Sequence, residues 1–514
     1  MTQNERMSLP IWKKILLLIV SIIFFVIQIT LLIMAFDFSF SYTASNVKWI
    51  YFLTLGIGFS FVLYILSKSI SIHYKLTWSI LILMFPLPFC MLYVLNGSSR
   101  HLSKRKMTKI NTAIGKIRVN DAFEELKEND AVGGNLVRVV QHSTFAPVYK
   151  DYSFKYFSDV YEKYLDMLEE IKKAKHYIFM EYFIIADGFL MNNLYPILEQ
   201  KGKEGLQIKI LYDDIGSKKV MSRSLLKKLS TIPNCKINNY EPLGLNVNFL
   251  VNYRDHRKIL IIDGRVAYCG GDNLADEYIH KKERFGYWRD NCAKYEGSIV
   301  FSFLMLFGEM WYVSTREKLP NDLPIDKTLT SSNGYAMVFG DGPSNNFNPA
   351  YDLFQSLISS AQKYVYISTP YFVIDDSMIN TIALKAKSGV DVRILMPKIP
   401  DKKTVFYMGR GNYREILKAG GKIYEYSPGF NHAKNIIVDD SYAFIGTINM
   451  DYRSLFLHYE CGALILHDSQ IINMKQDFEQ AIKDSEKVQY IRWKKRPWYQ
   501  KLIAYVLNLL APMF

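Results

Sequence analysis

Two short stretches of the sequence each combine a histidine, a lysine and an aspartate at the same spacing. In each stretch the lysine lies two residues after the histidine, and the aspartate lies seven residues after the same histidine. The six residues are His256, Lys258, Asp263, His432, Lys434 and Asp439. Imidazoles serve as nucleophiles and as proton carriers near neutral pH, and ammonium groups offset the charge of phosphate oxygens. The pattern therefore predicts catalysis on a phosphate ester by all six residues.

The two copies agree beyond these three positions. A glycine and an asparagine follow each histidine at distances of 14 and 17 residues, at Gly270 and Asn273 in the first copy and at Gly446 and Asn449 in the second. Glycine permits a close approach of backbones, and an asparagine amide can donate a hydrogen bond to a phosphoryl oxygen. The shared offsets indicate one duplicated catalytic unit, with the two asparagines as phosphate-binding residues.

Two imidazoles that meet at one phosphodiester can divide the work of covalent catalysis. One histidine attacks phosphorus, while the other protonates the departing alkoxide and then deprotonates the acceptor hydroxyl in a second step. Lys258 and Lys434 bind the phosphate and offset charge on its non-bridging oxygens. We therefore expect neither a metal ion nor an organic cofactor to take part.

Each catalytic histidine needs a partner that orients its second ring nitrogen. The candidates are Asp290, 34 residues after His256, and Glu460, 28 residues after His432. A lone histidine elsewhere in a chain is most often an ordinary structural residue. We interpret the following histidines in that way: His73, His142, His176, His280, His458 and His467.

The residues between each lysine and its aspartate are largely apolar and β-branched, which predicts buried strands at 259–262 and 435–438. Residues two apart in a strand face the same side, so each histidine and its lysine should point toward one site. The pairs Asp263-Gly264 and Asp439-Asp440 suit hairpin turns that return the chain. Aspartate at 263 and 439 can therefore be explained by the turn as well as by catalysis.

The chain repeats the same order of elements around the two motifs. A helical pattern at 161–173 leads into a strand at 177–183, and one at 351–362 leads into a strand at 364–372. A second short strand, preceded by a helix-ending glycine, follows in both halves. The alternation predicts an α/β fold of two duplicated half-domains, with mixed β-sheets flanked by helices, packed about a pseudo-twofold axis.

Three apolar stretches precede these halves, at 15–36, 49–66 and 76–95, and Pro86 and Pro88 interrupt the last. The first is long enough to cross a hydrocarbon core of about 30 Å and too long for a cleaved signal peptide. We therefore expect N-terminal transmembrane helices and a multi-pass protein of the cell membrane. The basic flanks favour a cytoplasmic catalytic portion if the proline-containing segment turns back within the bilayer; three full crossings are the alternative.

Composition favours an anionic lipid partner. Of the 514 residues, 49% are hydrophobic and 15% aromatic, and the formal net charge is +14. A positive chain with apolar stretches suits a lipid surface better than a nucleic acid. The five scattered cysteines show no paired motif, so we expect free thiols without a disulfide framework or a cysteine-bound zinc ion.

The expected organisation has five parts: a membrane region at 1–100, a linker and the start of the catalytic region at 101–150, half-domains at 151–335 and 336–490, and a C-terminal helix at 491–514. That last segment places basic residues beside tryptophans and ends in an apolar helical pattern. Such a segment is typical of an interfacial anchor on anionic lipid, and a packed terminal helix is the alternative.

The paired motifs resemble those of the phospholipase D superfamily, and in particular those of bacterial cardiolipin synthases, from about Tyr152 to the C-terminus. The matching stretches are 256–273, 428–434, 446–454, Thr369-Pro-Tyr-Phe372 and Trp288-Arg-Asp290. The resemblance implies transfer of a phosphatidyl group from one phosphatidylglycerol to another through a phosphohistidine, giving cardiolipin and glycerol in the bacterial cell membrane. Either histidine has been considered the nucleophile in that family, and we prefer His256.

Other functions fit parts of the pattern. A hydrolytic phospholipase D, or a phosphatidyltransferase with a different alcohol acceptor, would use the same covalent intermediate. A nuclease with paired histidines is disfavoured by the apolar stretches, and a non-catalytic scaffold is disfavoured because both motifs are intact. The expected partners are therefore phosphatidylglycerol and anionic membrane lipid, without nucleic acid, and a homo-oligomer is left open.

Overall fold

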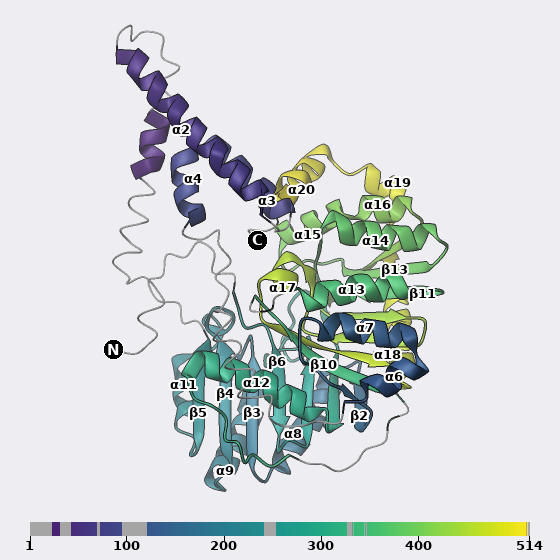
Figure 1. Ribbon diagram of the computed structural model, residues 1–514. Coiled ribbons are helices and arrows are strands. Elements are labelled where there is room, and N and C mark those ends of the chain that lie inside the picture. Colours follow the sequence, from purple (N-terminus) through teal and green to yellow (C-terminus); the bar gives the residue numbers. More distant parts are fainter. Residues whose placement is uncertain are drawn as a thin grey trace. The chain divides into compact units, whose positions relative to one another are not determined.

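The computed structural model (Figure 1) describes residues 23–30, 43–68, 72–94, 121–240, 253–325, 332, 334–343, 345, 347–509 and 511. The chain divides into two compact units. The smaller unit contains the N-terminal helices, and the larger unit contains both β-sheets and the helices that cover them.

The smaller unit contains α2 (Thr43–Leu66), α3 (Ile72–Met84) and α4 (Pro86–Leu92). The break between α3 and α4 falls at Phe85, because the residue before a proline is disfavoured in helical conformation. A small shared core joins these helices and contains Val62, Ile65, Trp78, Ile82 and Tyr93. Among the described residues, no helix combines the length and the apolarity that a membrane crossing requires. The predicted span at 15–36 lies mostly outside those residues.

The first sheet of the larger unit has the order β2-β9-β7-β6-β3-β4-β5. Neighbours β3, β4 and β5 run parallel, and the other pairs are antiparallel, so the sheet is mixed. Its strands are β2 (Tyr152–Phe157), β3 (Tyr177–Tyr182), β4 (Gln207–Asp213), β5 (Cys235–Tyr240), β6 (Lys258–Ile262), β7 (Val266–Gly270) and β9 (Cys292–Gly297).

The second sheet has the order β1-β10-β19-β17-β16-β11-β13-β14-β20. Apart from the edge strands β1 and β20, this order repeats that of the first sheet strand for strand, as the sequence repeat predicts. The strands are β1 (Val148–Tyr149), β10 (Tyr335–Asp341), β11 (Tyr364–Ser368), β13 (Asp391–Pro397), β14 (Lys422–Tyr426), β16 (Asn435–Val438), β17 (Tyr442–Gly446), β19 (Glu460–Leu466) and β20 (Ser485–Lys487).

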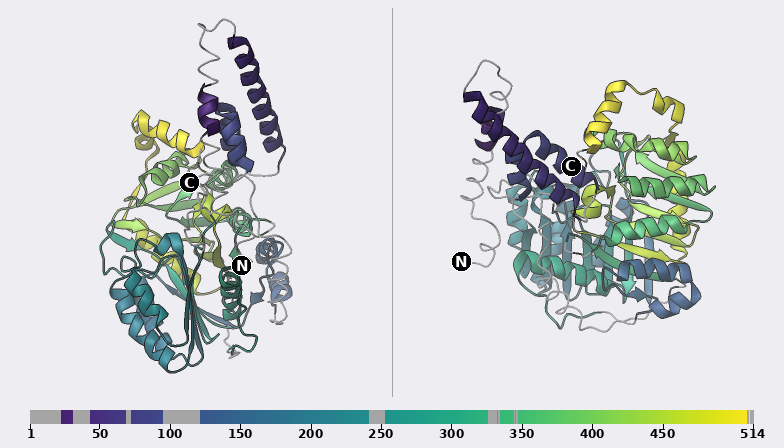
Figure 2. Two further views of the ribbon diagram at one scale, coloured as in Figure 1. Left: turned by 90° about the vertical axis from the view of Figure 1, so that its left-hand side faces the viewer. Right: turned by 45° about the horizontal axis from the view of Figure 1, so that its top comes forward.

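Helices pack on the faces of these sheets (Figures 1 and 2). In the first half, α8 and α9 contribute to one core, and α12 contributes to another that contains side chains of both sheets. The helices of the larger unit are α6 (Phe123–Asn129), α7 (Ala131–Gln141), α8 (Val160–Lys172), α9 (Phe189–Lys203), α10 (Asp214–Ser217), α11 (Arg223–Ser230), α12 (Val300–Thr315), α13 (Pro349–Ser360), α14 (Asp376–Lys387), α15 (Lys403–Gly411), α16 (Tyr413–Lys418), α17 (Tyr452–Phe456), α18 (Gln470–Lys483) and α19 (Tyr490–Lys494). The terminal helix α20 (Trp498–Leu509) begins in the larger unit and ends in the smaller one.

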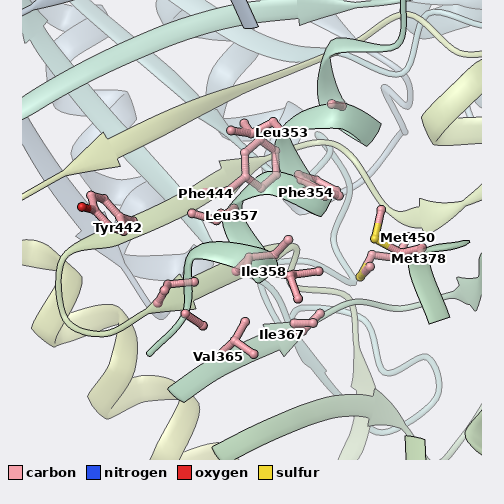
Figure 3. Close-up of a cluster of buried hydrophobic side chains, with 14 of the residues drawn as sticks. Leu353, Phe354, Leu357, Ile358, Val365, Ile367, Met378, Tyr442, Phe444 and Met450 are labelled. Carbon is pink, nitrogen blue, oxygen red and sulfur yellow. The ribbon is translucent and has the colours of Figure 1, made fainter. Parts of the chain in front are cut away.

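In the core of the second half, α13 packs against β17, the strand that pairs with the motif strand β16. Figure 3 shows Leu353, Phe354 and Leu357 of α13 packed near Phe444 of β17. Each of these side chains is at least 99% buried, and full burial of such a residue contributes about 1.5–3 kcal/mol. The helix α7 packs on α13 in the same core, so the segment before β1 belongs structurally to the second half.

Four short strands complete the fold and lie outside the two large sheets. They are β8 (Tyr287–Arg289), which pairs with β15 (Gly429–Asn431), and β12 (Phe372–Val373), which pairs with β18 (Met450–Asp451). The five cysteines all fall within the described residues and are free thiols, as predicted.

Candidate active site

The two motif histidines stand at the start of the central strands. His256 precedes β6, which begins at Lys258, and His432 precedes β16, which begins one residue after Lys434. Both strands are fully buried and form hairpins with β7 and β17, as the sequence predicts. The histidines are 8% and 7% exposed, so both side chains are largely buried.

Each catalytic histidine is bonded to a carboxylate of the other half. Nδ1 of His256 lies 2.8 Å from Oε1 of Glu460, and Nδ1 of His432 lies 2.6 Å from Oδ2 of Asp290. Both carboxylates that the sequence proposes as orienting groups therefore lie at a ring nitrogen. The expected pairing within each half is wrong, because the chain exchanges the two carboxylates between the halves.

Backbone pairing explains this exchange. The backbone N–H of His256 donates to the carbonyl of Tyr459, directly before Glu460, at 2.9 Å. In the other dyad, the N–H of His432 donates to the carbonyl of Arg289, directly before Asp290, at 2.7 Å. The parallel pair β8–β15 extends the second contact. Each histidine is therefore fixed by the segment that delivers its carboxylate.

Both lysines lie buried beside their histidines. Nζ of Lys258 donates to the carbonyl of His256 at 2.5 Å, and Nζ of Lys434 donates to the carbonyl of His432 and lies 2.9 Å from its Nδ1. A Cβ atom at Gly271 would lie 2.0 Å from Oδ1 of Asp290 and 3.0 Å from Nζ of Lys434. Lys434 thus reaches the backbone of the first half, and glycine at 271 leaves room for it.

The charges of both halves act on one centre. Burial, together with the ammonium groups of Lys434 and Lys258, holds the pKa of His432 well below its usual range. Burial also lowers the pKa of His256 to about 3, against the opposing charge of Glu460. At neutral pH both rings are therefore uncharged, and each can donate Nδ1–H to its carboxylate and keep a lone pair on Nε2.

The carboxylates of Asp290 and Glu460 differ in the direction in which their pKa is shifted. Burial raises the pKa of Asp290 to about 6, although Lys434 opposes the shift. Burial acts in the same direction on Glu460, but the interaction with His256 outweighs it and holds the pKa of Glu460 well below its ordinary value. Glu460 is thus the more firmly ionised of the two at neutral pH.

The motif aspartates lie apart from this centre and serve the turns. The Asp263 carboxylate accepts the backbone N–H groups of Lys175, His176 and Tyr177 at 2.7 to 2.8 Å. Asp263 and Asp439 both have left-handed φ angles of 53° in the hairpin turns. Seven residues, most of them in an extended strand, separate each aspartate from its histidine, about 23 Å at 3.3 Å per residue. The predicted direct catalytic role of Asp263 and Asp439 is corrected to a structural one.

We expect Asp439→Asn to lower stability and leave the chemistry intact. The carboxylate of Asp439 accepts the N–H groups of Gln362, Lys363 and Tyr364, and an amide must turn a donor toward one of them. An unsatisfied or opposed donor costs about 1–3 kcal/mol, whereas kcat of the folded protein should stay within a factor of about three. Urea unfolding and steady-state kinetics measure the two effects. The neighbouring variant Asp440→Asn is the control, and a loss of kcat specific to Asp439→Asn would restore the catalytic role.

The predicted phosphate-binding asparagines have different surroundings. Asn273 already accepts from the N–H of Ile184 at 3.0 Å and donates to the hydroxyl of Tyr278 at 2.6 Å. Through these bonds Asn273 joins the segment after β3 to the segment around Tyr278. Asn449 is buried, and its Oδ1 has no hydrogen-bond partner among the described residues. Asn449 is therefore the better placed of the two to receive a ligand.

Sequence reasoning missed two residues that contact Glu460. The hydroxyl of Thr447 donates to Oε2 of Glu460. Nδ1 of His458 lies 3.6 Å from Oε1, and its ring centroid is 5.4 Å from that of His256. His458 is thus no isolated structural histidine. Neither residue carries a repeated spacing that would have revealed it.

Comparison with known proteins agrees with this site. Residues 167–284 and 354–482 match the family described as "Cardiolipin synthase, PLD-like domain". A cardiolipin synthase of Alkalihalophilus pseudofirmus is 34% identical over 447 residues, which cover 85% of this chain and 88% of that protein. The chain belongs to the bacterial cardiolipin synthase family of the phospholipase D superfamily.

Other relatives of this cardiolipin synthase family member extend the comparison. An uncharacterised protein of Streptococcus mutans is 37% identical over 462 residues, covering 88% of this chain and 99% of that protein. A crystal structure of phosphatidylserine synthase from Haemophilus influenzae is 16% identical, covers 74% of this chain and 100% of its own, and has a TM-score of 0.58. The latter likeness shows a common fold.

Proposed function

We propose that this protein is a membrane-embedded phosphatidyltransferase that makes cardiolipin and glycerol from two molecules of phosphatidylglycerol. The observation that carries the proposal is the pair of crossed histidine–carboxylate dyads, each beside a buried lysine. Membership of the cardiolipin synthase family supports the choice of substrate.

In the proposed first step, Nε2 of His256 attacks the phosphorus of one phosphatidylglycerol. A P–N bond forms, the P–O bond to the headgroup glycerol breaks, and His432 supplies the proton that the departing oxygen takes up. The firmly ionised Glu460 favours His256 as the nucleophile, because it stabilises the positive charge that develops on the ring. The anionic substrate in turn favours the protonated form of His432 before the reaction.

In the proposed second step, His432 removes the proton from a headgroup hydroxyl of a second phosphatidylglycerol. That oxygen attacks phosphorus, the P–N bond breaks, and His256 is regenerated. Lys258 and Lys434 offset the charge on the non-bridging oxygens in both steps. Cardiolipin leaves, and the protonated His432 is ready to serve as the acid of the next cycle.

We expect kcat/KM to fall above about pH 8. Burial lowers the pKa of Lys434 to about 8, and the protonated form is the one that neutralises the phosphate. As pH rises through that value the ammonium group is lost, so kcat/KM should fall about tenfold per pH unit above it. Initial rates at low substrate from pH 6 to 10 give the profile. A flat profile to pH 10 would argue against a catalytic charge on Lys434.

Product analysis tests the function directly. The purified full-length protein is incubated with phosphatidylglycerol alone, and the lipids are identified by mass spectrometry. Cardiolipin with an equal amount of glycerol is the expected outcome. Dominant phosphatidic acid would instead identify a hydrolytic phospholipase D, and a third lipid formed only with an added alcohol would identify a different acceptor.

The membrane part of the proposal rests on exposed apolar surface in the N-terminal and C-terminal helices. Large side chains of α2, among them Phe52, Leu53 and Phe59, are 57 to 65% exposed. In α20, Trp498 and Tyr505 are exposed in the same way, close to the basic residues at 492–496. Such surfaces suit a bilayer and its anionic interface. Protease treatment of right-side-out vesicles should leave the catalytic portion intact if it faces the cytoplasm.

A further inference from the structure

A third imidazole, that of His458, stands next to one of the two dyads. The side chain of His458 is 11% exposed, and its Nδ1 has no hydrogen-bond partner among the described residues. This nitrogen lies 3.6 Å from Oε1 of Glu460, the same oxygen that lies 2.8 Å from Nδ1 of His256. A buried ring nitrogen of this kind normally finds a donor, an acceptor or a metal ion.

The three side chains are arranged as a set of metal ligands. One donor atom from each of His256, His458 and Glu460 lies within 4.8 Å of the other two. A tetrahedral zinc ion with bonds of about 2.0–2.2 Å holds its ligands about 3.4 Å apart, so modest side-chain rotations close the set. Two imidazoles and one carboxylate are the donors that zinc prefers at sites that keep a fourth position open.

We propose that His256, His458 and Glu460 form a binding site for a divalent transition-metal ion such as Zn²⁺, and that the bound ion inhibits the enzyme. The ion takes the place of the Nδ1 proton between His256 and Glu460. That proton moves to Nε2 of the same ring, so no proton is gained or lost overall. Nε2 then carries hydrogen and has no lone pair with which to attack phosphorus.

Charge near the three ligands permits a cation there. The Lys258 ammonium opposes the ion, but it is directed to the carbonyl of His256. The buried carboxylate of Glu460, itself one of the three ligands, supplies the negative charge that favours the ion. Magnesium, which prefers oxygen ligands and keeps its waters, fits this set poorly. The site should therefore discriminate Zn²⁺ from Mg²⁺.

The binding test uses the full-length protein in detergent micelles, dialysed against buffered ZnCl₂. We expect the wild type to bind Zn²⁺ at this site and His458→Asn to bind it about tenfold more weakly or worse. His176→Asn removes an exposed histidine elsewhere and should behave as the wild type. Equal Zn²⁺ binding by the wild type and His458→Asn would overturn the proposal.

Co²⁺ provides a second test that needs no variant. This ion replaces Zn²⁺ in tetrahedral sites and then absorbs strongly in the visible region. Addition of CoCl₂ to the wild type should give such bands, and ZnCl₂ but not MgCl₂ should remove them. Absence of the bands in the folded wild type would contradict the assigned ligand set.

The inhibition test rests on the proposed function, whereas the two binding tests do not. Micromolar ZnCl₂ should reduce cardiolipin formation at least about tenfold in the wild type, and a chelator should restore it. The ratio of rates with and without ZnCl₂ should be close to one in His458→Asn. Equal inhibition of both proteins would overturn the proposal, whereas failure to make cardiolipin at all would count against the function and leave the metal-binding result standing.

Discussion

Replacing His256 with asparagine abolishes cardiolipin formation, with an expected loss in kcat of at least ~10⁴-fold. Asparagine keeps a polar side chain of similar reach but has no nitrogen that can form the covalent bond to phosphorus. His432→Asn should cause a loss of similar size, because the second ring moves the protons in both steps. Each variant should remain folded, since asparagine is a polar residue that is smaller than the ring it replaces, and a thermal unfolding curve checks this.

Trapping of the intermediate separates the two roles. With phosphatidylglycerol labelled in its phosphate, His432→Asn should acquire acid-labile label on the protein slowly, because the first step lacks its acid, and should then retain the label, because the second step lacks its base. His256→Asn should accumulate none. The control is His176→Asn, an exposed histidine outside the site, which should retain full activity. Label on the His256 variant but not on the His432 variant would exchange the assignments, and rapid turnover by either variant would contradict two-histidine catalysis.

Glu460→Gln should lower kcat by about 10³–10⁴-fold. The amide would present a donor to Nδ1 of His256, whose bond to Oε1 of Glu460 is 2.8 Å long. The ring would then hold its proton on Nε2 and would lose the charge that stabilises it during attack. Steady-state kinetics measures the loss, and the labelling experiment locates it in the first step.

A matched variant tests whether any buried glutamate would behave in this way. Glu425 is also buried in the second half, where it pairs with Arg410 at 2.9 Å, and Glu425→Gln should affect stability more than kcat. The labelling result also tests the crossed geometry. If Glu460→Gln still formed the intermediate and failed only in the second step, Glu460 would act on His432, and the crossed pairing would be refuted.

The local parts of the fold could be predicted because local chemistry determines them. The β-branched run after Lys258 and the Asp263-Gly264 turn specify a buried hairpin, and a similar run followed by the Asp439-Asp440 turn does so after Lys434. The equal offsets in the two copies predicted the repeated topology for the same reason. Each of these features depends on neighbours in the chain.

The partners across the two halves could not be predicted from spacing. Asp290 and Glu460 occupy equivalent places in the repeat, so sequence separation gives no means of telling a partner within a half from one in the other half. The backbone hydrogen bonds from His256 to Tyr459 and from His432 to Arg289 decide which carboxylate each ring meets. His458 was missed for a related reason, since it belongs to no repeated pattern and gains its importance from its contact with the ring of His256 in the other half.

Residue type alone also led to the wrong role where a catalytic and a structural role need the same functional group. An aspartate in a catalytic motif and an aspartate that accepts backbone N–H groups look the same in sequence, and Asp263 is of the second kind. The amide of Asn273 likewise suits a phosphate and suits the Tyr278 hydroxyl that it contacts. Such choices depend on which groups the fold brings near.

The exchange of carboxylates makes the two repeats mutually dependent. A fragment that ends before residue 336 would contain one complete motif, yet His256 would lack the acid that sets its tautomer. Separately produced halves should therefore be inert alone and regain activity only on association. The same dependence means that a damaging substitution in either repeat disables the histidine of its neighbour, so neither copy is free to diverge while the other maintains the reaction.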